Sequence, residues 1–466
     1  MSKLLIKNAD WVITLDDHGT RYANADILIE GNAIKEIGLN LPADHDTRVL
    51  DARGKVVIPG MVNTHHHFYQ TLTRSIPATQ EIELFDWLIK LYEIWRELDE
   101  EAVYFGTLVA LGELLKTGCT TTTDHHYVFP KGKGANLIDV QIKAAQAIGM
   151  RFHPTRGSMS LSKKDGGLPP DDVVQREEEI LADSERLIKT YHDPSPYSMC
   201  RIALAPCSPF SVTEKLMRET VVLARKHGVL CHTHLAETKD EERFCLERFG
   251  MRPFEYMKSL DWYGEDIWFA HSIHLNDEEI REMGRTRSGV AHCPVSNLKL
   301  SSGIARVKEL IDAGARVGLA VDGSASNDSS NMWAELKTAY LLQKLTLGQE
   351  GLSAEETLRM ACRGGAAVLG RSDVGYLAPG MAADLVLINF NDLAFAGAQH
   401  DPVAAIVTCG DSQVVDTTIV NGKIVVRNGR LVAFDEEFIV ANANRISAKM
   451  VEKAGKRTGI NYFRRN

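Results

Sequence analysis

The sequence predicts an α/β protein in which a (β/α)8 TIM barrel carries a small β-sandwich domain formed by both chain ends. In the middle of the chain, apolar strand-like runs alternate with amphipathic helical patterns, which is typical of a parallel sheet covered by helices. Both ends instead show short alternating runs separated by turns, which indicates antiparallel strands. The expected domains are 1–58 with 375–435 (the composite β domain), 59–374 (the barrel) and 436–466 (a C-terminal helix and tail).

The first 58 residues predict a small antiparallel sheet. Gly31-Asn32 and the stretch 51–54 supply turns between its strands, because glycine, asparagine and aspartate tolerate turn conformations. The strand candidates are 4–6, 11–15, 26–29 and 33–37.

The barrel prediction depends on a count of eight β-rich runs, which is the number that closes such a barrel over about 250 residues. The runs are 56–64, 119–126, 150–158, 201–209, 229–236, 266–273, 288–295 and 316–323. The helical patterns are 100–117, 171–190, 213–227, 240–260, 276–285, 303–313, 331–346 and 353–369. An open doubly wound sheet is the alternative, but no G-x-G-x-x-G follows the first run, which counts against a dinucleotide fold.

After Gly370 the sequence again shows short alternating runs separated by turns, as expected of antiparallel strands. Asn421-Gly422 is a typical hairpin turn. The expected strands are 383–388, 404–407, 414–420 and 423–426, followed by a helix at 437–455. We therefore expect the two ends to build one domain, with the barrel inserted between them.

The composition indicates which kinds of partner and which cellular compartment to expect. The net charge of −9, with both signs interspersed, argues against a basic nucleic-acid-binding face. No run approaches the roughly 18 apolar residues of a membrane span. The eight cysteines are scattered and form no C-x-x-C pair, which favours a reduced, cytoplasmic protein over a disulfide scaffold.

Histidines and acids recur where the predicted barrel strands end. His65 and His67 follow the first run, and side chains two apart on a strand share a face. An isolated H-x-H is more often an ordinary pair of histidines than a metal site. Here, however, later runs end in the same residue types: His232, His234 and Glu237, then His271, then His292, then Asp322. Because active sites lie at the carboxyl ends of barrel strands, the sequence predicts a metal site there.

These segments resemble the amidohydrolase superfamily, and within it the cytosine/guanine deaminase and chlorohydrolase branch. The resemblance covers nearly the whole chain. It depends on five motifs, at 59–67, 234–237, 270–271, 291–300 and 322–327, together with the end-domain segment 375–386. It implies that His65, His67, His234 and Asp322 bind one divalent metal.

The residue types agree with that implication. Three imidazoles and a carboxylate suit Zn²⁺ first, with Fe²⁺ as the alternative in the same geometry. Other branches bridge two metals with a carboxylated lysine on the fourth strand, but the run 201–207 has no lysine. One metal is therefore expected.

The expected reaction is the attack of metal-activated hydroxide on an electron-poor ring carbon, with loss of an amine. Glu237 lies three residues past His234. Its expected role is that of a proton shuttle that protonates a ring nitrogen. His271 is expected to hold the hydroxide or polarise the substrate, and Asp322 to take the proton of the attacking water. The alternative, which the surrounding motifs make less favoured, is that Glu237 is a surface glutamate at a helix start.

Four residues are expected to bind the substrate, a small heterocycle. Gln70 can offer a donor and an acceptor to a lactam edge, and Trp87 can stack on a flat ring or simply pack under a lid. Arg156 and Cys207 follow the third and fourth strands. The first loop and the segment after Asp322 look most like those of enzymes that convert 8-oxoguanine to uric acid and ammonia.

Several questions stay open on the sequence alone. A triazine hydrolase of the hydroxyatrazine or chlorotriazine type, or an isoxanthopterin or guanine deaminase, would share most of these motifs. A catalytically silent scaffold would usually have lost ligands that are present here. The resemblance leaves a homo-oligomer open. Strand alternation cannot separate His232 from His234, and no role is assigned to His66, His125, His126, His274 or His292.

Overall fold

The computed structural model describes residues 2–134, 136–410 and 414–464. The remaining positions (1, 135, 411–413 and 465–466) fall within the predicted end domain, barrel and tail, and they lie outside the described residues.

Eight parallel strands form the barrel sheet, in the order β14-β13-β12-β11-β10-β9-β8-β6. At the seam between its first and last strands, the backbone N–H of Thr64 donates to the carbonyl of Leu319 at 3.1 Å. Nearly every strand residue is buried, as expected of strands covered by helices. The strands are β6 Met61–Asn63, β8 Cys119–His126, β9 Arg151–Ser158, β10 Ala203–Pro206, β11 Leu230–Leu235, β12 Ile267–His271, β13 Gly289–His292 and β14 Arg316–Leu319.

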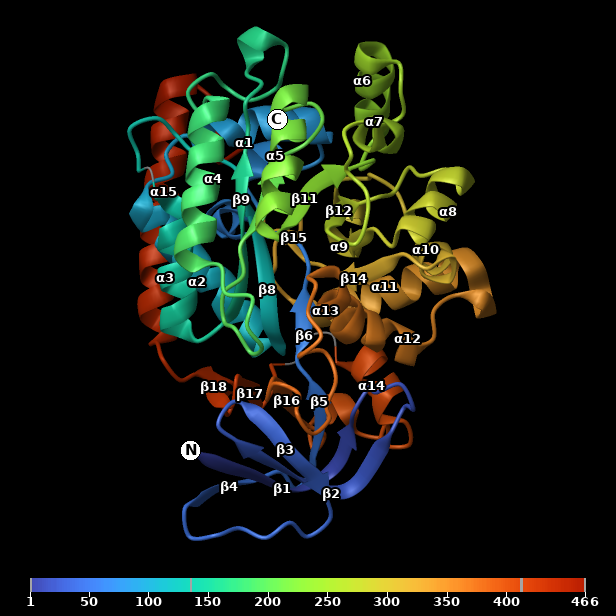
Figure 1. The fold of residues 1–466 in the computed structure, drawn as a ribbon. Helices are drawn as coiled ribbons and strands as arrows, with labels where there is room; N and C mark the ends of the chain where they lie inside the picture. The colour runs from blue at the N-terminus through green and yellow to red at the C-terminus, as the bar shows by residue number, and fades with distance from the viewer. Residues whose placement is uncertain (1, 135, 411–413, 465–466) are drawn as a thin grey trace.

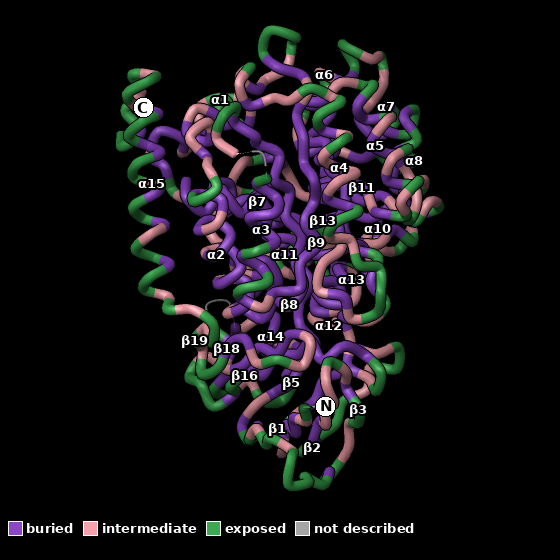
Figure 2. Tube along the Cα trace, turned by 60° about the vertical axis from the view of Figure 1, so that its left-hand side comes forward, coloured by how far each residue is buried: buried purple, intermediate pink, exposed green. Residues whose placement is uncertain are grey.

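Helices surround this sheet, and buried residues concentrate inside them (Figures 1 and 2). Side-chain caps fix several of their starts, as at Asp99, Thr213 and Asn276. The helices are α1 Leu84–Trp95, α2 Glu100–Lys116, α3 Leu137–Ile148, α4 Glu177–Tyr191, α5 Glu214–His227, α6 Lys239–Phe249, α7 Pro253–Ser259, α8 Asp277–Thr286, α9 Pro294–Lys299, α10 Val307–Ala313, α11 Met332–Leu347, α12 Ala354–Arg359 and α13 Gly365–Val368.

The two chain ends build a second sheet below the barrel (Figure 1). Its main path is β19-β18-β17-β16-β5-β1-β2-β3, with β4 paired to β1. β5 joins the two ends, because it pairs with β1 on one side and antiparallel with β16 on the other. The strands are β1 Lys3–Ile13, β2 Arg21–Glu30, β3 Ala33–Gly38, β4 Thr47–Asp51, β5 Lys55–Pro59, β16 Leu385–Asn389, β17 Thr417–Val420, β18 Lys423–Arg427 and β19 Arg430–Leu431. The last helix, α15 Glu436–Thr458, packs along α2 and α1.

Two predicted strands differ from the structure. The run 56–64 divides at Gly60 into β5, which belongs to the end sheet, and β6, which belongs to the barrel. A Cβ on Gly60 would lie 2.0 Å from Thr120 Oγ1, so only glycine lets the chain pass between the sheets. The predicted strand 404–407 is wrong, because these residues lie in α14, Pro402–Cys409. Asp401 caps that helix and Pro402 occupies its first turn, a start signal that outweighs the β-branched residues.

A buried ion pair ties the barrel to the end sheet. Arg151 on β9 makes two 2.8 Å hydrogen bonds to the Asp384 carboxylate, which lies just before β16. Both side chains are at most 1% exposed. Arg151 also donates to the carbonyls of Tyr197 and Ser198. The guanidinium is therefore well satisfied only while the two sheets stay docked.

Replacing Asp384 with asparagine is expected to lower the free energy of unfolding by about 3–5 kcal/mol, because it leaves the Arg151 charge buried without its partner. Denaturant unfolding followed by circular dichroism would measure the change. Asp51→Asn is the matched control, since its partner Arg53 lies at the surface, where ion pairs contribute little. Equal stability of the two variants would contradict the expectation.

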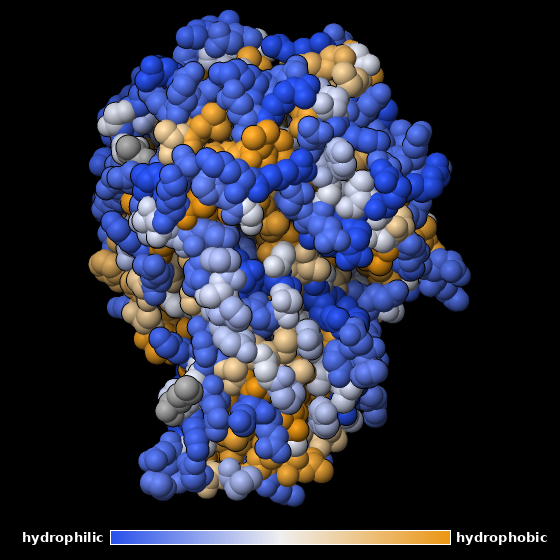
Figure 3. All heavy atoms as spheres, viewed as in Figure 1, coloured by the Kyte–Doolittle hydropathy of each residue, from blue (hydrophilic) through white to orange (hydrophobic). Residues whose placement is uncertain are grey.

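No helix in the described part of the chain is long and apolar enough to cross a membrane. Hydrophilic residues cover most of the face shown in Figure 3.

Candidate metal centre

A short strand pairing brings the first and last barrel segments together. Beyond β6, the two-residue strand β7 (His66–His67) pairs in parallel with β15 (Asp322–Gly323). The backbone N–H of Asp322 also donates to the carbonyl of His65 at 3.2 Å. The first and last strand segments of the barrel therefore bring His65, His67 and Asp322 close together. His234 comes from β11, which lies across the barrel from β6 in the strand order.

The ligand-type atoms of these four residues converge. Asp322 Oδ1 lies 3.2 Å from His65 Nε2 and 3.3 Å from His67 Nε2. His234 Nε2 lies 3.2 Å from His67 Nε2. All four residues are buried, and His65 Nε2 has no hydrogen-bond partner. Such a buried, orphaned nitrogen is costly unless another group satisfies it.

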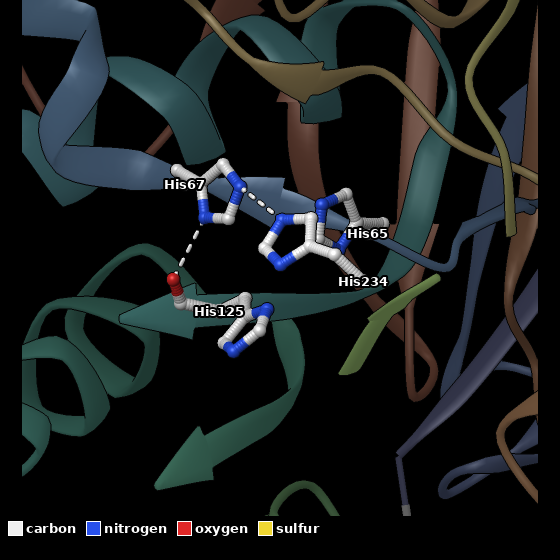
Figure 4. Close-up of side chains that lie close together, drawn as sticks. All are labelled: His65, His67, His125 and His234. Carbon is white, nitrogen blue, oxygen red and sulfur yellow. Dashed lines mark hydrogen bonds between the residues drawn. The ribbon is translucent and has the colours of Figure 1, made fainter. Parts of the chain in front are cut away.

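The outer nitrogens of two of these imidazoles are already committed. His67 Nδ1 donates to the carbonyl of His125 at 2.7 Å (Figure 4), and His234 Nδ1 donates to the carbonyl of Cys207 at 2.6 Å. A carbonyl can only accept, so each Nδ1 carries the proton and each Nε2 presents a lone pair. Lone pairs that face one another repel, and a cation between them removes the repulsion. The four residues therefore fit a divalent metal.

Burial keeps this set in the form that metals bind. It lowers the pKa of His234 to about 3 and the pKa of His65 well below its usual range. Burial also opposes ionisation of Asp322, but the adjacent imidazoles hold the pKa of its carboxyl well below the usual range. At neutral pH His65 and His234 are thus neutral imidazoles beside the Asp322 carboxylate, as ligation requires.

Serine hydroxyls orient the Asp322 carboxylate. Ser296 Oγ and Ser326 Oγ donate to Oδ2 at 2.5 and 3.2 Å. The backbone N–H of Gly323 donates to Oδ1 at 2.6 Å. These contacts fix the face of the carboxylate that meets the imidazoles.

Glu237 and His271 lie beside the cluster and face each other. Glu237 Oε2 is 3.6 Å from His271 Nε2, and His271 Nδ1 donates to Asn297 Oδ1 at 2.9 Å. Burial raises the pKa of Glu237. Burial also opposes protonation of His271, but the Glu237 and Asp322 carboxylates raise its pKa overall. The raised pKa makes the Glu237 carboxyl easier to protonate than an exposed glutamate, which suits general acid–base work.

Sequence reasoning missed one residue that supports Glu237. The buried Glu241 carboxylate accepts the backbone N–H groups of Ala236 and Glu237, at 2.8 and 3.0 Å. It sits in the first turn of α6 and folds back over the end of β11. A glutamate four residues after Glu237 was the only available signal, and surface helix starts carry the same pattern.

The backbone at these strand ends is strained. His271 and Asp322 have φ of 70° and 61°, and Ala236 has φ of 50°. Residues with side chains rarely adopt this left-handed region, and such conformations concentrate at functional sites.

A cavity opens beside the cluster. Of the predicted substrate-binding residues, Gln70, Trp87 and Cys207 line it. Its full lining is His67, Gln70, Leu84, Trp87, Leu88, Tyr92, Tyr127, Cys207, Phe210, His234, Glu237, His271, Leu300, Asp322 and Ser326.

Arg156 is not among the residues that line this cavity, so its expected role in substrate binding stays a prediction. Its guanidinium is buried on the helix side of β9, where it bonds Asp183 at 2.6 Å and Gln175 at 2.8 Å. It also lies 4.0 Å above the Phe129 ring. All of its visible contacts are structural.

The histidines to which the sequence assigned no role differ in their hydrogen-bond partners. His66 contacts Ser330 Oγ, and His274 donates to the carbonyl of Ser302. The His125 ring lies near the three converging imidazoles, and its Nε2 donates to the carbonyl of Ala205 at 2.8 Å. Within the described residues, neither ring nitrogen of His126 or His292 has a partner.

The chain is similar to known proteins over nearly its whole length. The model of the amidohydrolase family matches residues 56–425. An 8-oxoguanine deaminase from Pseudomonas aeruginosa is 47% identical, and the match covers 97% of this chain and 100% of that protein. An isoxanthopterin deaminase of unknown prokaryotic origin is 33% identical, over 96% of this chain and 97% of the relative.

Among solved structures, an atrazine chlorohydrolase from Arthrobacter aurescens TC1, complexed with zinc, superposes with a TM-score of 0.91. It is 34% identical, and the match covers 95% of this chain and 100% of that one.

Proposed function

This chain belongs to the amidohydrolase family, and from that membership we propose that it hydrolyses 8-oxoguanine to uric acid and ammonia. One observation carries the proposal: a single cavity is lined both by residues of the candidate metal cluster and by Glu237, a buried glutamate whose pKa is raised. The identity of 47% to an 8-oxoguanine deaminase supports the choice of substrate.

His65, His67 and His234, through Nε2, and Asp322, through its carboxylate, are the proposed ligands of one divalent metal. Zn²⁺ is the first choice for this donor set, with Fe²⁺ as the alternative. The zinc complex of the chlorohydrolase supports zinc. When bound, the metal supplies Lewis acidity that makes water nucleophilic near neutral pH.

The protein's own groups move the protons. Glu237 is proposed to protonate a ring nitrogen next to the amine-bearing carbon, which makes that carbon more electrophilic. Asp322 is proposed to accept the proton of the attacking water. His271, held by Asn297 through Nδ1, is proposed to hydrogen-bond the attacking oxygen through Nε2. Collapse of the tetrahedral adduct then breaks the C–N bond. The proton taken up by Asp322 passes to the departing amine, which leaves as ammonia, and the proton of the adduct hydroxyl restores Glu237.

Gln70, Trp87 and Cys207 are the proposed substrate-binding residues. Gln70 Oε1 accepts the backbone N–H of Ala325 at 3.3 Å, so its amide has a fixed orientation toward a lactam edge. Trp87 can stack on a flat heterocycle. The partner class is thus a small heterocycle, and the net charge of −9 fits this class better than nucleic acid. Eight free cysteines support a reducing, cytoplasmic location.

A triazine is the second candidate substrate. Several apolar side chains line the cavity, including Leu84, Leu88, Phe210 and Leu300. Such a lining would accept the alkyl groups of a substituted triazine, and the structural likeness to an atrazine chlorohydrolase agrees.

Ammonia release from the zinc-loaded enzyme tests the proposal, with 8-oxoguanine, guanine, isoxanthopterin and a hydroxytriazine assayed in parallel. Rapid release from 8-oxoguanine, with guanine a poor substrate, is expected. Turnover of the triazine alone would keep the proposed chemistry and overturn the proposed substrate.

Gly323→Ala is expected to raise the KM for 8-oxoguanine and to lower kcat/KM by up to about 10²-fold. The reason is steric, because a Cβ at this position would lie 1.9 Å from Gln70 Oε1 and would push the amide aside. Steady-state kinetics measures the effect. Gly38→Ala in the end sheet is the control, since its Cβ would meet side-chain atoms of Leu41 at 3.3 Å and Glu36 at 3.8 Å, both of which are flexible. An unchanged KM in Gly323→Ala would remove Gln70 from the proposed binding set.

A further inference from the structure

His232 forms the middle of a buried hydrogen-bonded chain. Its Nε2 lies 2.7 Å from His65 Nδ1, and its Nδ1 lies 2.9 Å from the carbonyl oxygen of Trp268. His232 and Trp268 are directly paired residues of β11 and β12. All three residues are at most 1% exposed, so water does not compete for these contacts.

The donor and acceptor types in this hydrogen-bonded series determine where each proton lies. The Trp268 carbonyl can only accept, so His232 Nδ1 carries a proton and donates it. In the neutral imidazole, Nε2 is then an acceptor. His65 must therefore donate through Nδ1, and its own Nε2 is left with a free lone pair. That is the orphaned nitrogen 3.2 Å from Asp322 Oδ1.

His65 differs in this respect from the other two imidazoles of the cluster. His67 and His234 each donate Nδ1 to a backbone carbonyl, an acceptor that no side-chain substitution removes. The Nδ1 partner of His65 is another side chain. His232 is itself held on its flat face, because it stacks on the Trp268 ring with centroids 4.4 Å apart and planes at 12°.

We propose that His232 is a positioning residue that holds His65 in the Nδ1–H tautomer and so commits His65 Nε2 to the metal. The proposal rests on the metal site of the proposed function. It also resolves the pair on β11: His234 is a ligand, and His232 supports a ligand that comes from the other side of the barrel. Partners that fix ligand tautomers typically contribute about 10–100-fold to metal affinity.

Three variants of His232 separate its contacts. Phenylalanine keeps a ring on Trp268 but offers no acceptor. Asparagine reaches the position of Nδ1 and can keep the bond to the Trp268 carbonyl, but it is too short to reach His65. Glutamine reaches the position of Nε2 and can accept from His65 Nδ1. His126→Phe is the matched control, since His126 is also buried but takes no part in the hydrogen bonds that link His65, His232 and Trp268.

The measurement is zinc affinity of the purified full-length chain, by equilibrium competition with a chromophoric chelator. We expect His232→Phe and His232→Asn to bind zinc about 10–100-fold more weakly. We expect His232→Gln and His126→Phe to stay within about threefold of the parent, and kcat of all variants to recover largely at saturating zinc. This recovery and the glutamine rescue would not follow from a merely structural role.

Two results would overturn the proposal: asparagine and phenylalanine variants that bind zinc as tightly as the parent, or a glutamine variant as weak as the asparagine variant. If His232→Phe does not fold, the comparison of asparagine with glutamine decides alone. Failure of the proposed metal site looks different, because the parent chain itself would then bind no zinc. Failure of the proposed substrate would show in the ammonia assay and would leave the order of these zinc affinities unchanged.

Discussion

Glu237→Gln is expected to lower kcat for 8-oxoguanine by about 10²–10⁴-fold, which is the usual contribution of a general acid–base group. Glutamine keeps the size of the side chain but cannot deliver a proton to the ring. Metal content should not change, because Glu237 faces His271 at 3.6 Å and is not among the proposed ligands. Steady-state ammonia release, with zinc measured on the same samples, checks both statements.

The control for this change is Glu278→Gln, at an exposed position on α8. It should leave kcat, KM and zinc content as they are in the parent enzyme. A Glu237→Gln enzyme that holds a full equivalent of zinc and turns over at the parent rate would remove Glu237 from the mechanism.

His234→Ala is expected to abolish stoichiometric metal binding, and activity with it. The substitution removes one of three imidazoles and leaves two facing nitrogens and a carboxylate around a gap. The loss of affinity should exceed the about 10–100-fold that removal of an outer support costs. Zinc content after dialysis and ammonia release at increasing zinc measure the two effects.

His227→Ala serves as the comparison, because His227 lies at the end of α5 and pairs with Glu185 at the surface. Zinc content and turnover of that variant should match the parent enzyme. If His234→Ala retained one zinc per chain after dialysis, the proposed ligand set would be wrong.

The sequence predicted much of the fold because its signals are local. Apolar runs of strand length, separated by helical periodicity, do not depend on distant contacts, and each barrel strand lies within its predicted run. The errors occur where a distant contact decides. The division at Gly60 follows from β5 pairing with β16, far along the chain, and α14 follows from a cap whose signal competes with β-branched residues.

The site was predictable in its residue types and less so in its contacts. Histidines and acids at strand ends identify the location, but alternation gives His232 and His234 the same face. Their roles separate only through partners on other elements, namely the carbonyls of Trp268 and Cys207. Arg156 shows the opposite case, since a residue near a strand end can turn outward to a helix and bond Asp183.

Because β5 lies between β1 and β16, one of its two edges stays unpaired for much of the time in which the chain is synthesised. The edge of β5 that β16 will cover leaves the ribosome early, and its partner is made only after the whole barrel. At about 5–20 residues per second, the wait is on the order of tens of seconds. During that interval an apolar strand edge lies open to pairing with other chains. We therefore expect expression yield to depend on chaperone supply, although the finished molecule leaves no such edge of β5 unpaired.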